Sequence, residues 1–309
     1  MRVDRFTVLA PATTANLGPG FDCAGAALDL WNELHVDPAD FGTPLVTLEG
    51  EGADELPADE SHLALQAFTL VLPVKRFSFR FVNRIPLERG LGSSAATVAA
   101  GVVAGLIAAG RDASLGDVLD LCLPFEGHAD NLVPALEGGV CLTWKDGEHR
   151  RTQRIASSLP LDAIVVVPEG RVSTKVSREQ LPEMLSHDEA AAAAAQAALL
   201  GAGVAAGDPA LLAAAFQDLL HEPYRLADAP LLSQLRERPV EGSAGVTLSG
   251  SGPSVVVWAV KEAGARAAAE LAARVSGVSV WPLQVAARGT HATGLPAAGA
   301  TAAGVGAAR

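Results

Sequence analysis

The residues from Arg89 to Ala96 read RGLGSSAA, and their types suit the binding of phosphate. Glycines let a backbone approach a ligand closely, and the two serines supply hydroxyl groups for a phosphate oxygen or a magnesium ion. An uncharged run follows as far as Gly110, which predicts a helix over 93–109. Because a helix N-terminus presents unpaired N–H groups and a partial positive charge, this loop is placed to attract an anion.

Two better-known motifs do not fit this stretch. A Walker loop needs a lysine after its last glycine, and none follows Gly92. A nucleophile elbow needs the pattern Gly-x-Ser-x-Gly, which cannot be drawn through Ser93 or Ser94. The alternative that remains is a plain helix start, in which a serine caps the helix after a glycine turn. The motif alone supports both interpretations equally.

A second glycine- and serine-rich loop, SGSGPS at 249–254, joins two apolar segments. By itself this pattern is more typical of a β-hairpin turn than of a binding loop. The presence of two such loops in one chain, however, favours a polyanion held between two units of the protein.

Further polar side chains gather in two other loops. The loop ATTANLGPGFD holds Asn16 and Asp22 in a frame of proline and glycine, and EGHADN brings together Glu126, His128, Asp130 and Asn131. The alternative for each acid or histidine is a solvated loop residue, and the alternative for Arg178 and Arg225 is a surface salt bridge. Five other histidines lack a polar constellation and are expected to be structural, namely His35, His62, His149, His187 and His291.

The composition argues against several classes of protein. The chain has 309 residues, 49% of them hydrophobic and 19% charged, so it can form a globular core. Its formal net charge of -12 would repel a phosphate backbone and opposes nucleic-acid binding as the main role. Three cysteines without a C-x-x-C pair, and no secretory signal, indicate a reduced, cytoplasmic protein. The run 90–110 is long enough to span a membrane, but its alanines and glycines favour a closely packed central helix.

The pattern of strands and helices indicates two α+β units. A strand over 6–10 breaks into a turn-rich loop, and Phe77, Phe79 and Phe81 alternate with polar residues in another strand. Beyond residue 150 the sequence predicts helices over SREQLPEML and the alanine-rich segment that follows it. We therefore predict an N-terminal unit at 1–150, a second unit at 151–290 and a loose Ala/Gly-rich tail at 291–309.

Five of these segments together resemble one family. PLERGLGSSAA looks like the signature of the GHMP small-molecule kinases, which include galactokinase, homoserine kinase and mevalonate kinase. PATTANLGPGFD, EGHADN and HEPYR are similar to segments of the homoserine kinase branch, and SGSGPS is similar to the superfamily's C-terminal glycine motif. The resemblance runs from about residue 3 to residue 290. HADN and ATTAN stand where HPDN and ATSAN are common, and both changes are mild.

The resemblance implies a fold, a cofactor and a metal. The expected GHMP kinase fold, of class α+β, joins an N-terminal ribosomal-protein-like α/β domain to a C-terminal ferredoxin-like domain, with ATP in the cleft between them. Magnesium would be held by Ser94 and by an acid of the EGHADN loop, Glu126. The residues expected to bind ATP are Pro86, Leu87, Glu88, Arg89, Gly90, Leu91, Gly92, Ser93, Ser94, Ala95, Ala96, Gly250, Ser251 and Gly252.

The resemblance also implies the substrate, L-homoserine, whose γ-hydroxyl would receive a phosphoryl group from ATP on the threonine pathway. The ammonium of this zwitterion needs an acid, and its carboxylate is best held by arginine forks. The residues expected to bind the substrate are Asn16, Asp22, His128, Asn131, Arg178 and Arg225.

The mechanism expected from the resemblance needs no strong base. Several sister kinases have an aspartate base at the position that matches Asn131, and an asparagine cannot take a proton. Because phosphoryl transfer depends mainly on positioning and charge neutralisation, Asn16 and Asn131 are the expected catalytic residues. They would align the hydroxyl until it loses its proton late, to the phosphate itself or to Asp22 or Asp130.

Three other functions are less well supported by the sequence. A GHMP kinase for another alcohol, such as mevalonate, fits poorly because two arginines and an aspartate suit an amino acid. A catalytically silent metabolite sensor would predict a damaged phosphate loop, and GLGSSA is intact. An RNA-binding module is opposed by the negative charge. No nucleic-acid or membrane partner is therefore expected, and a homodimer is left open.

Overall fold

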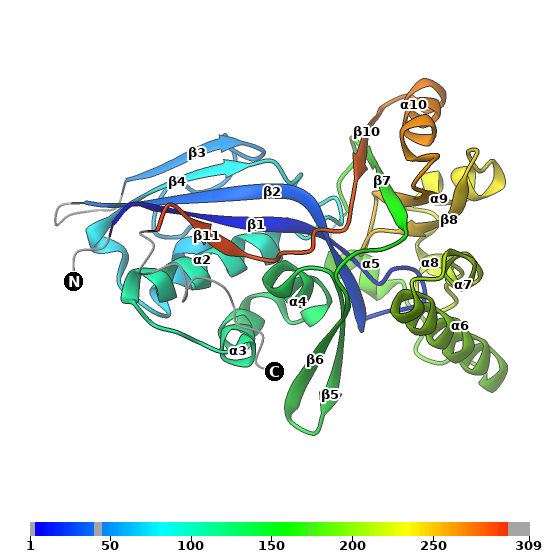
Figure 1. The fold of residues 1–309 in the computed structure, drawn as a ribbon, viewed down its shortest axis with the longest axis horizontal. Helices are drawn as coiled ribbons and strands as arrows, with labels where there is room; N and C mark the ends of the chain where they lie inside the picture. Colours follow the sequence, from blue (N-terminus) through cyan, green and yellow to red (C-terminus); the bar gives the residue numbers. More distant parts are fainter. Residues whose placement is uncertain (1–3, 40–44, 173, 296–309) are drawn as a thin grey trace.

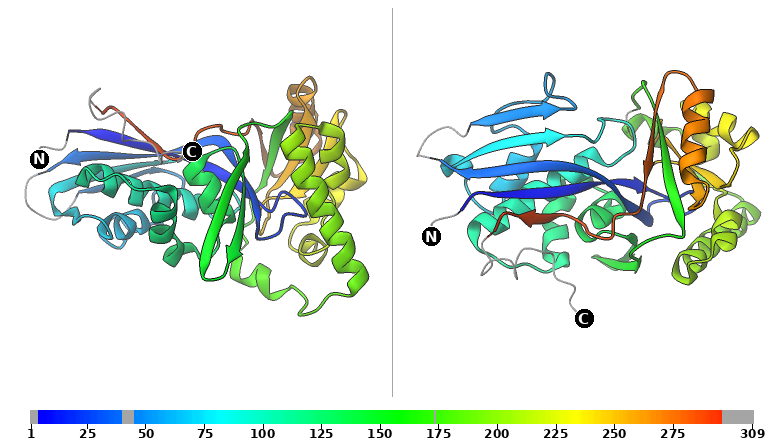
Figure 2. Two further views of the ribbon diagram at one scale, coloured as in Figure 1. Left: turned by 60° about the horizontal axis from the view of Figure 1, so that its bottom comes forward. Right: turned by 45° about the horizontal axis from the view of Figure 1, so that its top comes forward.

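The chain forms an elongated molecule with one β-sheet toward each end (Figure 1). The computed structural model describes residues 4–39, 45–172 and 174–295. Within these residues, the first sheet has seven strands and the second has four. Helices cover one broad face of the first sheet, and the second sheet packs against helices of its own (Figure 2).

The first sheet is organised by a long antiparallel pair, β1 (Phe6–Ala15) and β2 (Ala24–Pro38). The other strands of this sheet are β3 (Val46–Gly50), β4 (Phe77–Asn83), β5 (Val140–Asp146), β6 (His149–Ala156) and β11 (His291–Thr293). The strand order is β11-β1-β2-β4-β3, and β5 pairs with β2 and β6. The phenylalanines of β4 at 77, 79 and 81 are all buried, which confirms the predicted alternation.

The helices of the first unit pack around a central helix made of small residues. They are α1 (Leu63–Thr69), the short 3₁₀ helix η1 (Val74–Arg76), α2 (Ser93–Ala109), α3 (Leu115–Glu126) and α4 (Ala129–Glu137). The helix predicted over 93–109 is therefore confirmed. A Cβ at Gly101 of α2 would lie 2.2 Å from the carbonyl oxygen of Ala64 in α1. Glycine there lets the two helix backbones touch, so α2 is a core helix.

The second unit contains a four-stranded antiparallel sheet. Its βαββαβ series is β7 (Leu161–Pro168), α9 (Pro230–Glu237), β8 (Ser243–Leu248), β9 (Val255–Val260), α10 (Gly264–Arg274) and β10 (Val278–Leu283). The strand order β10-β7-β9-β8 is that of a ferredoxin-like sheet. Between β7 and α9 the chain adds α5 (Thr174–Glu179), α6 (His187–Ala206), α7 (Pro209–Ala215) and α8 (Glu222–Arg225).

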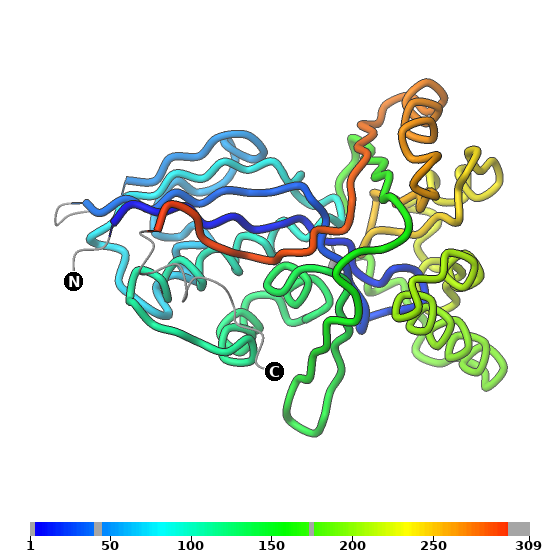
Figure 3. Tube along the Cα trace, viewed as in Figure 1, coloured from blue at the N-terminus to red at the C-terminus, as the bar shows by residue number. Residues whose placement is uncertain are grey.

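The chain passes to the second unit after β6 and returns to the first sheet after β10 (Figure 3). The change of sheet between Ala156 and Leu161 falls near the predicted boundary. The prediction of a loose tail over 291–309 is wrong for its first residues, because His291–Thr293 form a strand that pairs with β1 at the edge of the sheet. His291 also packs edge-on against Trp31, at a ring distance of 5.4 Å. Residues 296–309 of that tail lie outside the described residues.

Two other elements differ from the sequence prediction. β1 extends to Ala15 rather than stopping at Ala10, because its last residues pair with Gly25–Leu28 of β2. The predicted helix over SREQLPEML ends at Glu179, since Pro182 disfavours helical geometry in the residue before it.

Two helices, α2 and α6, bear on whether the chain could span a membrane. The run 90–110 corresponds to α2, most of whose residues are buried, which confirms a packed central helix. Within the described part of the chain, α6 is the one helix long and apolar enough to cross a membrane, by length and composition only. α6 was not identified from the sequence as a membrane candidate, and one such helix is weak evidence for a membrane span.

Candidate active site

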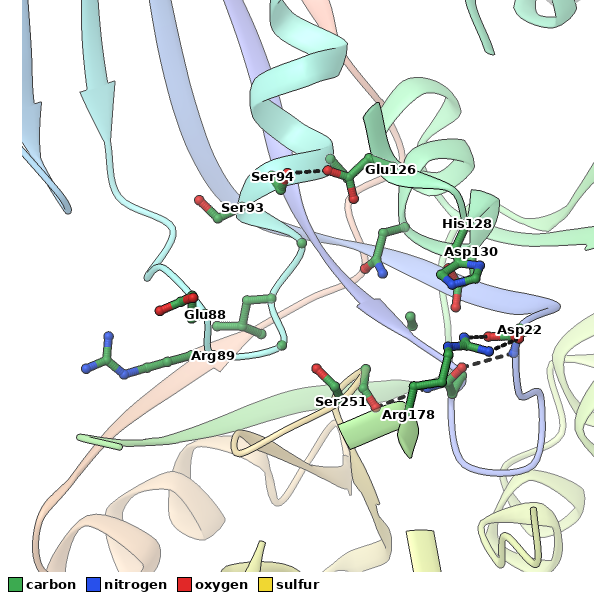
Figure 4. A pocket seen from close by; sticks show the side chains of 18 of the residues that line it. Asp22, Glu88, Arg89, Ser93, Ser94, Glu126, His128, Asp130, Arg178 and Ser251 are labelled. Carbon is green, nitrogen blue, oxygen red and sulfur yellow. Dashed lines mark hydrogen bonds and ion pairs between the residues drawn. The ribbon is translucent and has the colours of Figure 1, made fainter. Parts of the chain in front are cut away.

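A pocket lies where the loop before α2 faces the turn between β8 and β9 (Figure 4). Both units contribute to its lining. The lining residues are Ala15, Asn16, Phe21, Asp22, Pro86, Glu88, Arg89, Gly90, Leu91, Gly92, Ser93, Ser94, Ala95, Glu126, His128, Asp130, Asn131, Arg178, Arg225, Gly250 and Ser251. The predicted site residues are all among them except Leu87, Ala96 and Gly252. Ala96 is fully buried inside α2, and Leu87 packs toward Gly52 instead.

The N-terminus of α2 reaches the pocket without a side chain bonded to it. Its N-cap is Gly92, in the left-handed conformation with φ of 66°, and no side chain caps the helix. The alternative in which a serine caps this helix is therefore wrong. The unpaired N–H groups of the first turn and the helix dipole are left to bind an anion such as phosphate.

Two glycines are required in the loop before α2 by both conformation and space. Gly90 and Gly92 have φ values of 72° and 66°. A Cβ at Gly92 would lie 1.9 Å from Thr13 Oγ1, and a Cβ at Gly90 would lie 2.1 Å from the carbonyl oxygen of Ser249. Any larger residue would push the loop away from β1 or from the second unit.

The SGSGPS turn joins β8 and β9 as the hairpin interpretation predicts, and it also lines the pocket. Ser249 Oγ donates a hydrogen bond to the carbonyl oxygen of Gly90 at 2.6 Å. The carbonyl oxygen of Gly250 accepts from Asn16 Nδ2 at 3.1 Å and from Arg225 Nη1 at 3.2 Å. This turn therefore connects the glycine loop before α2 to Asn16 and Arg225 at the other end of the pocket.

Ser94 and Glu126 meet at the start of α2. Ser94 Oγ donates a hydrogen bond to Glu126 Oε1, whereas Ser93 points away from the acid (Figure 4). Burial raises the pKa of Glu126, and the bond from Ser94 opposes this shift. A hydroxyl and one carboxylate beside a phosphate site are the hard oxygen ligands that magnesium takes together with substrate phosphates. Among the described residues no group of three or more His, Cys, Asp or Glu could hold a metal, so phosphate oxygens would have to complete this site.

Asp22 and Arg178 form an ion pair at the other end of the pocket (Figure 4). Arg178 Nη1 and Nη2 donate to the two carboxylate oxygens at 3.0 and 2.7 Å. The pair joins the loop after β1 to α5, and the bond to Asp22 raises the pKa of Arg178. Asp22 has a φ of 56°, so the backbone of this loop is bent to present the carboxylate.

Arg225 is buried behind this pair, with 3% of its surface exposed. The alternative of a surface charge is therefore wrong for this residue. Its Nη1 donates to His221 Nδ1 at 2.9 Å, and burial followed by the nearby Arg178 lowers its pKa. The guanidinium carbons of Arg178 and Arg225 lie 5.3 and 5.5 Å from the ring centre of Phe21. Two cations thus share one aromatic ring, and only Arg178 is paired with Asp22, so Arg225 is available to an anionic ligand.

Asp130 is a buried acid in the same part of the pocket. It is 5% exposed, and its Oδ1 has no hydrogen-bond partner in the structure. Burial first, and then the nearby Asp22, raise its pKa to about 6, while Arg178 opposes the shift. A buried oxygen without a partner is costly, and a cation placed in the pocket would satisfy it.

The two expected catalytic amides have different surroundings. Asn131 Oδ1, at the start of α4, accepts a hydrogen bond from Thr13 Oγ1 at 2.7 Å. Asn16 uses both ends of its amide within the protein, because Oδ1 accepts from the backbone of Asp22 and Nδ2 donates to Gly250. Asn16 thus shapes the loop that carries Asp22, and its role in aligning a hydroxyl stays a prediction.

Two residues that organise this end of the pocket were not predicted from the sequence. Phe21 stacks on His221 at a ring distance of 5.0 Å and lies against both arginines. Since His221 Nδ1 accepts from Arg225, its Nε2–H donates to the carbonyl oxygen of Gly18 at 3.1 Å. The only signals in the sequence were their places beside Asp22 and in HEPYR.

Comparisons with known proteins agree with this architecture. The model of the GHMP kinases N-terminal domain matches residues 61–139. A homoserine kinase of Synechococcus is 38% identical over 262 residues, which cover 82% of this chain and 85% of that protein. A homoserine kinase of Streptomyces coelicolor is 40% identical over 260 residues, 82% of this chain and 84% of that protein.

Solved structures give the same picture. The homoserine kinase of Cytophaga hutchinsonii has a TM-score of 0.83 and 28% identity, covering 94% of this chain and 98% of that one. The mevalonate kinase of L. major shares the fold alone, with a TM-score of 0.72 at 17% identity. The fold and the glycine loop are thus those of the GHMP kinases, which are ATP-dependent kinases of small molecules. Within this class, the chain belongs to the homoserine kinase family.

Ser94→Ala tests the metal-binding interpretation of the phosphate loop. We expect turnover to fall on the order of 100-fold, because a ligand that would place the metal against the phosphates is lost. The magnesium concentration for half-maximal rate should rise, and the melting temperature should stay near that of the parent. Ser93→Ala, which removes a hydroxyl that does not contact Glu126, serves as the comparison and should lose less. Parent-like turnover of folded Ser94→Ala at low magnesium would contradict the assignment.

Proposed function

We propose that the protein transfers the γ-phosphoryl group of ATP to the γ-hydroxyl of L-homoserine and forms O-phospho-L-homoserine for threonine biosynthesis. The observation that carries this proposal is the set of charges opposite the glycine loop. Asp22 and Arg178 face each other there, with Arg225 beside them on the ring of Phe21. An amino acid that carries an alcohol would place its charges on this set and its hydroxyl toward the phosphates.

The Asp22–Arg178 pair suits a zwitterion for a simple electrostatic reason. A zwitterion offers an ammonium to Asp22 and a carboxylate to Arg178, so each residue exchanges one charged partner for an equivalent one. Neither charge is left unpaired in a partly buried site, which would be costly. Arg225, already buried and oriented by His221, would supply a second fork to the carboxylate.

Asp130 would add a second oxygen to the ammonium site. Asp130 lines the pocket near Asp22 and Arg178, and its buried Oδ1 has no hydrogen-bond partner that would compete with an incoming ammonium. This interpretation differs from the expectation that Asp130 is a candidate proton acceptor, because it uses the ionised acid as a ligand. Mevalonate, the alternative substrate, has a carboxylate but no ammonium, so it would offer no cation to either acid.

Transfer itself would depend on alignment rather than on a base. ATP would place its phosphates at the N-terminus of α2, and magnesium held by Ser94 and Glu126 would neutralise their charge. Asn131 would hold the acceptor hydroxyl toward the γ-phosphate, with His128 completing the wall. Since the transition state is loose, the hydroxyl proton can leave late, to the phosphate. The homodimer is left open, and the absence of a nucleic-acid partner stays a prediction.

Asn131→Asp tests whether a base is missing. We expect turnover to fall or stay unchanged, because a carboxylate cannot donate to an acceptor oxygen and adds negative charge near ATP. The measurement is the pH profile of kcat with saturating ATP and homoserine. A clear gain in kcat together with a new acidic limb would show that proton abstraction, and not alignment, limits the parent.

If Asp130 binds the ammonium, kcat/KM for homoserine should depend on pH. The pKa of this acid is raised to about 6, so its ionised form is lost as the pH falls through that value. We expect kcat/KM for homoserine to fall about tenfold per pH unit below pH 6, and kcat to hold to lower pH because bound ammonium favours the carboxylate.

The control for this acidic limb of the pH profile is Asp130→Asn, which should lower kcat/KM and abolish the limb. Other titratable or charged groups facing Asp130 are Asp22, Cys23, His128 and Arg178. Persistence of the limb in Asp130→Asn would assign it to another group and remove Asp130 from the ammonium site.

Arg225 tests recognition of the carboxylate. A charge-assisted contact is worth roughly 1.5–3 kcal/mol, or about 10–150-fold in kcat/KM. Arg225→Ala should lose this factor on homoserine while keeping its affinity for ATP, and Arg225→Lys should recover part of it. Arg274→Ala, which breaks an exposed ion pair of the same unit, should behave like the parent.

The decisive comparison uses 3-aminopropan-1-ol, which is homoserine without its carboxylate. It should be a poor substrate for the parent and lose little more in Arg225→Ala. Equal losses on both substrates, or parent-like use of homoserine by both Arg225 variants, would place the carboxylate elsewhere.

A further inference from the structure

Thr13 lies at the back of the pocket wall, on β1, and is fully buried. Neither the glycine motif nor the expected site residues include it. Its side chain nevertheless contacts both the glycine loop before α2 and the amide of Asn131. A phosphoryl transfer requires these two groups to lie close together.

Three contacts fix Thr13 against the glycine loop and α4. Its backbone N–H donates to the carbonyl oxygen of Leu91 at 3.1 Å. Its hydroxyl lies directly on Gly92, where a Cβ would be only 1.9 Å from Oγ1. The same hydroxyl donates to Asn131 Oδ1 at 2.7 Å. One side chain therefore sets the distance between the N-terminus of α2 and the start of α4.

The bond from Thr13 also decides which end of the Asn131 amide serves the pocket. Because Oδ1 accepts the threonine proton, the NH2 group is the end left for a bound molecule. An NH2 group donates hydrogen bonds, so it can hold the oxygen of an alcohol or of a phosphoryl group but cannot remove a proton. The orientation thus agrees with a transfer that depends on alignment.

We propose that Thr13 is a positioning residue that fixes the amide of Asn131 relative to the phosphate-binding loop, and so aligns the acceptor hydroxyl with the γ-phosphate. This inference rests on the proposed function, since it uses Asn131 as the group that holds the acceptor. Its failure and that of the proposed function can be told apart, because one readout needs no turnover.

The test compares two substitutions at Thr13 with a matched one elsewhere. Thr13→Val keeps the shape and removes the hydroxyl, whereas Thr13→Ser keeps the hydroxyl. Thr290→Val is the control, because Thr290 is 2% exposed and its Oγ1 donates to Ala135 of the same helix α4 at 2.8 Å, away from the pocket. Thr13→Val and Thr290→Val each replace a buried hydroxyl that donates to α4 with a methyl group, so a merely structural role would affect both variants alike.

We expect activity to fall in Thr13→Val and not in the other two single variants, and the fall to be in kcat and not in KM. In Thr13→Val, kcat should fall about 10–100-fold, while KM for homoserine and the affinity for ATP change by less than about threefold. Thr13→Ser and Thr290→Val should keep kcat within about threefold of the parent. In the double variant Thr13→Val/Asn131→Ala, kcat should equal that of Asn131→Ala, because the threonine acts through that amide.

The second readout is the NMR signal of the Asn131 side-chain amide in ¹⁵N-labelled protein. It should shift in Thr13→Val and stay in place in Thr290→Val. Parent-like kcat in folded Thr13→Val, an equal loss in Thr290→Val, full additivity with Asn131→Ala, or an unmoved amide signal would each overturn the proposal. If the parent does not phosphorylate homoserine, the proposed function fails, and the amide signal still decides the role of Thr13.

Discussion

The contact between Gly90 and Ser249 holds the whole site together. Ser249 donates to the carbonyl oxygen of Gly90, and its own carbonyl lies where any Cβ at position 90 would have to be. A loop of the first unit and a turn of the second are therefore in backbone contact, which requires glycine. Because Gly250 next to this contact accepts from Asn16 and Arg225, the same turn also sets the polar end of the pocket.

Charge is distributed along the pocket in a way that the net charge of -12 does not suggest. The uncapped N-terminus of α2 attracts anions at one end. At the other end, two arginines share the ring of Phe21, and two acids, Asp22 and Asp130, face them. A molecule with a polyphosphate at one end and a zwitterion at the other would find partners for all of its charges. An acidic surface outside the pocket does not oppose this, because such interactions are local and screened over about 10 Å.

Local patterns in the sequence were enough to predict the helix over 93–109, the alternation in β4 and the hairpin around SGSGPS, because these features depend on neighbouring residues. Most of the pocket lining was expected instead from the resemblance to the GHMP kinases. The stack of Phe21 on His221, the bond from Thr13 to Asn131 and the pairing of β11 with β1 could not be predicted, because each joins segments far apart in the chain. Likewise, Asp22 and Arg178 were both expected to bind substrate, yet their pairing with each other depends on the fold.

Identification of the reaction product would show whether this pocket transfers a phosphoryl group to an amino acid alcohol. The parent protein, ATP and magnesium would be incubated in parallel with L-homoserine, mevalonate or galactose, and the products followed by ³¹P NMR. We expect ADP together with a phosphate monoester on the γ-oxygen of homoserine, and little turnover of the other two alcohols. Phosphorylation of mevalonate or galactose in preference to homoserine, or ATP consumption without a homoserine phosphate ester, would contradict this expectation.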